Sequence, residues 1–108
     1  MDIRQVNLPK PVSGESLEEA CKKAAKELGY KAKSHDYFIE KYTLGSVRRH
    51  QDYDRTEMRI SNLMPALRVD FIKKGKHQEY FFVEVGFPFY FASEERVQEY
   101  LIAVSKYL

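Results

Sequence analysis

An arginine-rich segment in the middle of the chain is the first group of residues whose chemistry could support a function. Its candidate ligand-binding residues are Arg48, Arg49, Tyr53 and Arg55. Arginine forks bind phosphate through two parallel hydrogen bonds, and an exposed tyrosine ring can stack on a base. A second basic stretch contains Lys73, Lys74 and Lys76. The Arg48–Arg59 loop and the Lys73–Lys76 hairpin therefore predict a nucleic-acid-binding domain as one candidate function.

Acidic residues within the same segment favour a different interpretation. Asp52, Asp54 and Glu57 alternate with the arginines. Ion pairs among them would cancel the positive field that phosphate binding requires. The alternative is therefore a solvated loop whose charges neutralise one another.

The same segment contains a weak metal-binding pattern. In an extended chain, His50, Asp52 and Asp54 would lie on one side and offer nitrogen and oxygen ligands. However, Arg49 and Arg55 flank them and would repel a cation. We therefore expect no metal ligand set here.

Two carboxylates, Asp70 and Glu84, lie on strands that the sequence places next to one another. Carboxylates so arranged can hold Mg²⁺ for phosphodiester cleavage. Over residues 66–86 this layout resembles the PD-(D/E)xK nuclease core, which implies a Mg²⁺-dependent nuclease with these two acids as ligands. Gly86 stands where that family carries its lysine, so we do not assign the chain to the family. The alternative is a pair of polar-face residues that bind neighbouring basic side chains such as Arg68.

No other pattern points to catalysis or to a cofactor. Cys21 lies within the apolar stripe of an expected helix, which indicates a packed thiol rather than a nucleophile. The three histidines, His35, His50 and His77, are scattered, and the five glycines are isolated, so there is no phosphate-binding glycine loop. We therefore expect no cofactor and favour a non-enzymatic protein.

The aromatic residues are concentrated near the C-terminus. In the expected strand from Gln78 to Val85, Tyr80 and Phe82 lie on the face opposite Phe81. A strand that is apolar on both faces is typically central. The run Phe87–Phe91 follows, for which core packing is the favoured role. It could instead dock a partner, line a ligand cleft, or fold back over the sheet.

The elements that must position these residues begin with two helices. Ser16 and Glu19 fit a capping box, with Ser13 as the alternative cap, and Gly29 suits the end of that helix. The last helix is expected to begin after Ser93. Its buried stripe is expected to contain Val97, Leu101, Val104 and Leu108.

Four strands are expected between the helices. Residues 36–44 favour a strand over a helix because of their β-branched and aromatic content, and Gly45–Asp54 is expected to be a loop. Alternating apolar residues predict strands at 56–61 and 67–71, and the return strand begins near Gln78 after a turn at 73–76. Residues 1–12 are expected to be extended, with only a short edge strand at most.

The sequence thus predicts one α+β domain over residues 1–108, in the order α-β-β-β-β-α. The sheet is expected to be mainly antiparallel, with the N- and C-terminal helices packed on one face. Two helices cannot cover both faces, so the leading function is an interaction module. It would form a homodimer or bind a protein partner through the aromatic face of Tyr80 and Phe82.

The composition indicates the cellular compartment and the partner classes that we expect for such a domain. The 108 residues include 18 basic and 16 acidic side chains, a net charge of +2 that does not by itself indicate nucleic acid or membrane. One cysteine permits no internal disulfide, and the N-terminus has no apolar signal segment. We therefore expect a cytoplasmic protein with no membrane partner.

Overall fold

The computed structural model describes residues 2–39, 42–44, 47–49, 53–72 and 77–108, with side chains described for 2–35, 56–71 and 77–108. In chain order these residues form β1 (Asp2–Val12), α1 (Gly14–Glu27), β2 (Lys31–Ile39), β3 (Tyr42–Leu44), β4 (Val47–Arg49), β5 (Tyr53–Ser61), β6 (Pro65–Ile72), β7 (Gln78–Val85) and α2 (Glu94–Lys106).

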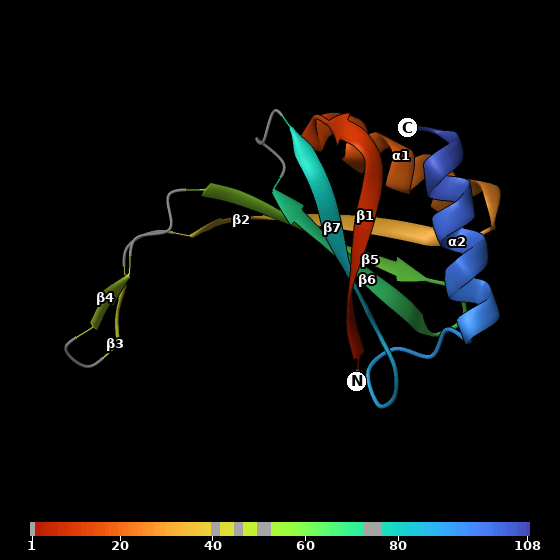
Figure 1. Cartoon of the computed structure of the whole chain (residues 1–108). Coiled ribbons are helices and arrows are strands. Elements are labelled where there is room, and N and C mark those ends of the chain that lie inside the picture. The colour runs from red at the N-terminus through yellow and green to blue at the C-terminus, as the bar shows by residue number, and fades with distance from the viewer. Residues whose placement is uncertain (1, 40–41, 45–46, 50–52, 73–76) are drawn as a thin grey trace.

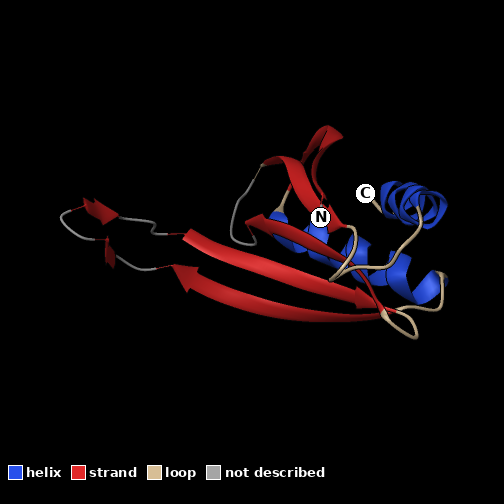
Figure 2. Cartoon of the chain, turned by 90° about the horizontal axis from the view of Figure 1, so that it is seen from below, coloured by secondary structure: helices blue, strands red, loops and turns tan. Residues whose placement is uncertain are grey.

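Five strands form one antiparallel sheet in the order β1-β7-β6-β5-β2, and β3 and β4 form a separate two-stranded ribbon. The ribbon lies at the far end of the long β2–β5 hairpin (Figure 1). Both helices lie on the same face of the sheet (Figure 2). The predicted α+β class, with an antiparallel sheet covered on one face, is confirmed.

The core lies between that face and the helices. Alternate residues of β5, β6 and β7 point into it because successive strand side chains lie on opposite faces. They meet the apolar stripe of α1 around Leu17 and Cys21 and that of α2 around Val97 and Tyr100. Neither helix in the described part of the chain is long and apolar enough to cross a bilayer.

The N-terminal residues differ from the prediction, because they form the full edge strand β1. It pairs with β7 from Asp2 opposite Val85 to Asn7 opposite Tyr80, and the register then shifts before Val12. Pro9 lies in the shifted part, where a missing N–H costs no ladder bond. The sheet therefore has five strands, and β7 lies second from an edge.

The first helix is capped one turn earlier than the preferred Ser16. Ser13 is the N-cap, and its hydroxyl oxygen accepts a hydrogen bond from the Ser16 backbone N–H at 3.1 Å. The predicted capping box with Ser16 as N-cap was wrong, and the alternative N-cap, Ser13, was correct. Gly29 follows the helix with φ +77°, a conformation that glycine adopts without steric cost.

Replacing Ser13 with alanine is therefore expected to lower the free energy of unfolding by about 1 kcal/mol. The comparison change Ser16→Ala removes an exposed hydroxyl that accepts a hydrogen bond from the Ser13 hydroxyl at 2.9 Å but does not cap the helix, and it should cost less than about 0.5 kcal/mol. Urea denaturation of both variants measures the difference. A larger loss for Ser16→Ala would contradict the observed cap.

Ser93 caps α2 as predicted, and its hydroxyl accepts from the Arg96 N–H at 3.3 Å. The buried stripe differs, however. Tyr100 is fully buried, whereas Leu101 is only partly buried. The Tyr100 hydroxyl donates to the Cys21 carbonyl oxygen at 2.9 Å and so joins the helices. Cys21 is buried, as expected, and burial raises the pKa of its thiol to about 12.

The middle of the chain is more strand-rich than the sequence indicated. The preferred strand for residues 36–44 is confirmed in part: residues 36–39 end β2, and residues 42–44 form β3, a separate strand of the two-stranded ribbon. The expected loop over 45–54 was wrong, because it contains β4 and the start of β5. Cross-strand pairing stabilises the hairpin of β2 and β5, and this pairing cannot be recognised from single residues in the sequence.

Candidate functional site

The face of the sheet opposite the helices holds the candidate site. Strand pairing sets Gln5 opposite Phe82, Arg68 opposite Glu84, and Glu57 opposite Asp70. All six side chains lie on this face, because the intervening residues enter the core. The open face is the name used below for the group Ile3, Gln5, Asn7, Glu57, Arg59, Arg68, Asp70, Tyr80, Phe82 and Glu84.

One half of the open face is uncharged and partly apolar. Tyr80 and Phe82 meet edge to face, with ring centroids 5.5 Å apart, and they are 45% and 39% exposed. Ile3 is exposed beside them, and the Gln5 amide donates to the Asn7 side-chain oxygen at 3.0 Å. Aromatic rings and amides thus offer both contact area and hydrogen bonds at this half.

The other half carries an ion-pair network. Glu57 is buried and accepts from Arg59 Nε at 2.8 Å and from Arg68 at 3.2 Å. Arg68 also pairs with the buried carboxylate of Glu84. The pair formed by Arg59 and Glu57 agrees with the interpretation that acids neutralise the arginines of this region. Arg68, which two buried carboxylates share, is therefore less accessible to a ligand than Arg59, whose side chain is 65% exposed.

The two proposed magnesium ligands, Asp70 and Glu84, lie on the open face as diagonal neighbours on β6 and β7. Both are buried, but Glu84 already has a cation in Arg68. This pairing follows the alternative of polar-face residues bound to basic neighbours. An open hollow of about 210 Å³ lies between the two halves, lined by Ile3, Arg68, Asp70, Phe82 and Glu84.

Tyr90 joins this region from the segment after β7. Gly86, with φ +107°, turns the chain out of the strand, and the Tyr90 N–H donates to the Gly86 carbonyl at 2.9 Å. Partial burial raises the pKa of the Tyr90 hydroxyl. The positive charge of Arg68 opposes this effect, and the negative charge of Glu84 adds to it. In the sequence, Phe87–Phe91 forms one apolar run, so the position of Tyr90 near Arg68 and Glu84 was not predicted.

The run Phe87–Phe91 was predicted to pack in the core, and this prediction is wrong. Phe87 and Phe89 are exposed, and Phe87 meets the partly exposed Phe91 edge to face at 5.9 Å. The run leaves Tyr80 and Phe82 partly exposed, and Tyr90 approaches the ion-pair half of the open face. Its backbone bonds to the start of β6 hold it at the end of the sheet.

The predicted basic site falls outside what the structure describes. Lys73, Lys74 and Lys76 are outside the described residues, as are His50 and Asp52. The backbones of Arg48, Arg49, Tyr53 and Arg55 belong to β4 and β5, but their side chains are not described. The nucleic-acid surface built on these residues therefore stays a prediction.

Comparison with family models, curated proteins and solved structures finds no match to this chain. Its function therefore has to be argued from the chemistry of its own surfaces. Among the described residues, no three of the types His, Cys, Asp and Glu come together in a group that could hold a metal ion.

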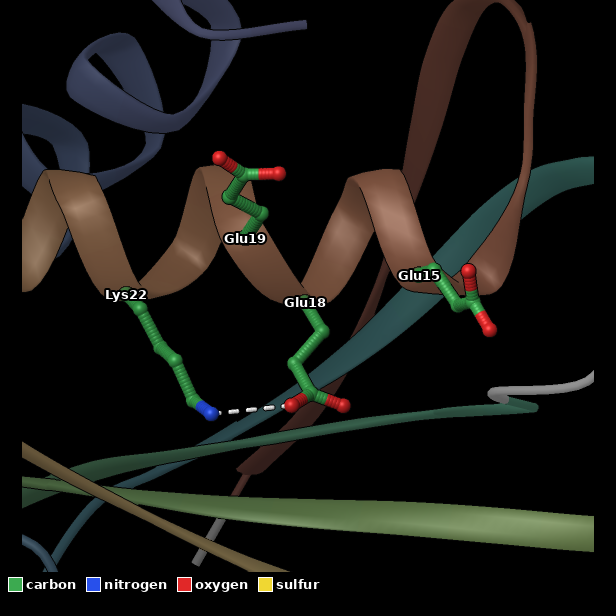
Figure 3. A pocket seen from close by; sticks show the side chains of 4 residues that line it. All are labelled: Glu15, Glu18, Glu19 and Lys22. Atoms are coloured by element: carbon green, nitrogen blue, oxygen red, sulfur yellow. Dashed lines mark hydrogen bonds and ion pairs between the residues drawn. The ribbon is translucent and has the colours of Figure 1, made fainter.

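A hollow of about 250 Å³ beside α1 is a weaker candidate (Figure 3). Its lining is acidic, but Glu18 points toward the sheet and pairs with Lys22 at 2.9 Å, while Glu19 points away and pairs with Lys23 at 3.0 Å. These i,i+4 pairs are ordinary features of a solvated helix. The open face is thus the better candidate site.

Proposed function

We propose that this domain is a non-enzymatic interaction module that binds a protein partner through its open face. The supporting observation is the partly exposed pair of Tyr80 and Phe82 on the face opposite the helices. Aromatic side chains are enriched at the centres of protein interfaces, where they contribute much of the binding energy.

The chemistry around the pair indicates what the partner presents. Tyr80, Phe82 and Ile3 would receive apolar side chains, and the amides of Gln5 and Asn7 would pair with backbone or amide groups. The neutralised network of Glu57 and the two arginines would form a polar rim. A rim of this kind contributes specificity more than affinity.

The exposed apolar area of the open face favours binding of a partner over self-association at this face. Taking about 200 Å² for a fully exposed large side chain, Ile3, Tyr80 and Phe82 together expose roughly 300 Å² of mainly apolar surface. A stable dimer buries about 800 Å² on each copy. The area suits a smaller, transient contact whose affinity comes from two or three central side chains.

Single-stranded nucleic acid is the second candidate. Tyr80 and Phe82 are two residues apart on the open face of an antiparallel sheet, and bases stack on aromatic rings in that arrangement. The acids Glu57 and Glu84 on this face are paired with Arg59 and Arg68, and Lys33 of β2 lies opposite Arg59, so the response to salt is the discriminating measurement. Binding that falls steeply with salt would support the nucleic acid.

We expect Phe82→Glu and Tyr80→Glu to abolish partner binding while the domain remains folded. The test is parallel capture from cell extract with wild-type and variant baits, followed by measurement of Kd with the purified partner. Each substitution should weaken binding by about 30-fold or more, as for a hot-spot side chain.

Ile102→Glu is the matched control, because Ile102 is an exposed apolar residue on α2, on the covered side of the sheet. It should leave binding unchanged. If wild-type and both open-face variants capture the same proteins with the same affinity, the proposal is wrong.

A further inference from the structure

A second apolar surface lies at the end of the sheet where the β5–β6 turn meets the segment after β7. The Phe91 N–H donates to the Pro65 carbonyl at 2.9 Å, and the Ala92 N–H donates to that of Ala66 at 3.1 Å. These bonds hold the two segments side by side near the start of α2 (Figure 1). The end patch is defined here as Leu63, Met64, Phe87, Phe89 and Phe91.

The end patch is larger than the apolar part of the open face. Leu63 is 98% exposed, Phe87 75% and Phe89 60%, while Met64 and Phe91 are about half exposed. At about 200 Å² for each fully exposed side chain, the five together expose roughly 650 Å². The largest apolar patch on a typical monomer is about 300–600 Å², and larger ones mark interaction sites.

The patch combines projecting rings with a hollow that could receive one. Phe87 and Phe89 project from the turn after β7. Phe87 contacts Phe91, which is one of the residues that line an open hollow of about 180 Å³. The lining consists of Tyr30, Asn62, Leu63, Met64, Pro65, Ala66, Phe91, Ala92 and Arg96. A cavity of about 150 Å³ lined by apolar side chains can hold benzene, so this hollow is large enough for a phenyl ring.

We propose that two copies of this chain form a two-fold symmetric homodimer through the end patch. A two-fold interface pairs one surface with itself, so that surface must carry both the projection and the hollow. Here a projecting phenylalanine of each copy would enter the hollow of the other. With its polar margin, the apolar area approaches the roughly 800 Å² per copy of a stable interface.

Charges at the margin of the patch suit a second copy better than an anionic lipid surface. Glu94 and Glu95 open α2 next to the hollow, and Glu94 is paired with Arg4 at 2.6 Å. Arg96 lines the hollow and donates to the Tyr30 hydroxyl at 3.1 Å. Both signs of charge are therefore present on one surface, which permits complementary contacts across a two-fold axis.

The dimer goes beyond the proposed function and uses none of the open-face residues. Sedimentation equilibrium of the full chain at about 100 µM tests it, because interfaces of this size reach at least micromolar affinity. Wild-type protein is expected at twice the 12.7 kDa chain mass. Leu63→Glu and Phe89→Glu, one in each segment, should each sediment as monomers.

Each substitution occurs twice in the dimer. A loss of about 30-fold for one hot-spot side chain therefore becomes about a thousand-fold in the dimer dissociation constant. Ile102→Glu and Phe82→Glu are the controls and should remain dimeric. Circular dichroism should show all four variants folded, because the replaced side chains are exposed or partly exposed.

Three outcomes would overturn the proposal. They are a monomeric wild-type protein at that concentration, a dimer that survives both end-patch substitutions, and a dimer that Phe82→Glu disrupts. The last would assign self-association to the open face. If Phe82→Glu no longer captures the partner but still forms the dimer, both proposals are supported. The two proposals are therefore tested separately.

Discussion

Replacing Tyr100 with alanine is expected to lower the free energy of unfolding by about 3–5 kcal/mol. The side chain is fully buried between the two helices and the sheet. Its removal leaves a cavity and also deprives the Cys21 carbonyl of the hydroxyl that donates to it at 2.9 Å. Urea denaturation followed by circular dichroism measures the change.

Two variants separate the contributions at this position. Tyr100→Phe keeps the ring and removes only the hydrogen bond, so it should cost about 1 kcal/mol. Leu101→Ala, at the neighbouring and only partly buried residue, should cost about 1–2 kcal/mol. If Leu101→Ala proved the more damaging of the two alanine variants, the buried face of α2 would be wrongly assigned.

Replacing Arg68 with methionine is expected to lower the free energy of unfolding by about 2–3 kcal/mol at neutral pH. Arg68 binds the buried carboxylates of Glu57 and Glu84. Methionine preserves much of the apolar stem but leaves Glu84 without its cation. The estimate lies below that for a fully buried pair, because Arg68 itself is a quarter exposed.

A second substitution tests that explanation. A buried, unpaired carboxylate destabilises the fold through its charge, so removing the charge of Glu84 should relieve part of the deficit of Arg68→Met. Adding Glu84→Gln should therefore recover part of the loss at pH 7, because Glu57 retains Arg59. A double variant that is no more stable than Arg68→Met would contradict the electrostatic cause.

Elements whose signals are local could be predicted from the sequence. Alternation at Met58 and Ile60, and again at Leu67 and Val69, defined two strands, because side chains of a strand alternate between core and solvent. Ser93 marked the start of α2, and Gly29 marked the end of α1. Burial of Cys21 also followed from its position in an apolar helical stripe.

The pairing of distant segments is visible only in the three-dimensional structure. Whether residues 2–12 form a strand depends on β7, some eighty residues later, which supplies their hydrogen bonds. The bulge around Pro9 and Pro11 interrupts the alternation that would have announced the strand. Similarly, the choice of Tyr100 over Leu101 as the centre of α2 depends on how that helix is rotated against α1 and the sheet.

For the candidate surfaces, residue types were visible in the sequence but exposure was not. Tyr80 and Phe82 were predicted on the open face from alternation alone, and they lie there partly exposed. Phe87, Phe89 and Phe91 were expected in the core because large apolar residues usually are buried. The core is already filled by the helices, and backbone bonds to Pro65 and Ala66 hold this run at the end of the sheet. Its rings therefore remain in solvent, because the helix-covered face has no room for them.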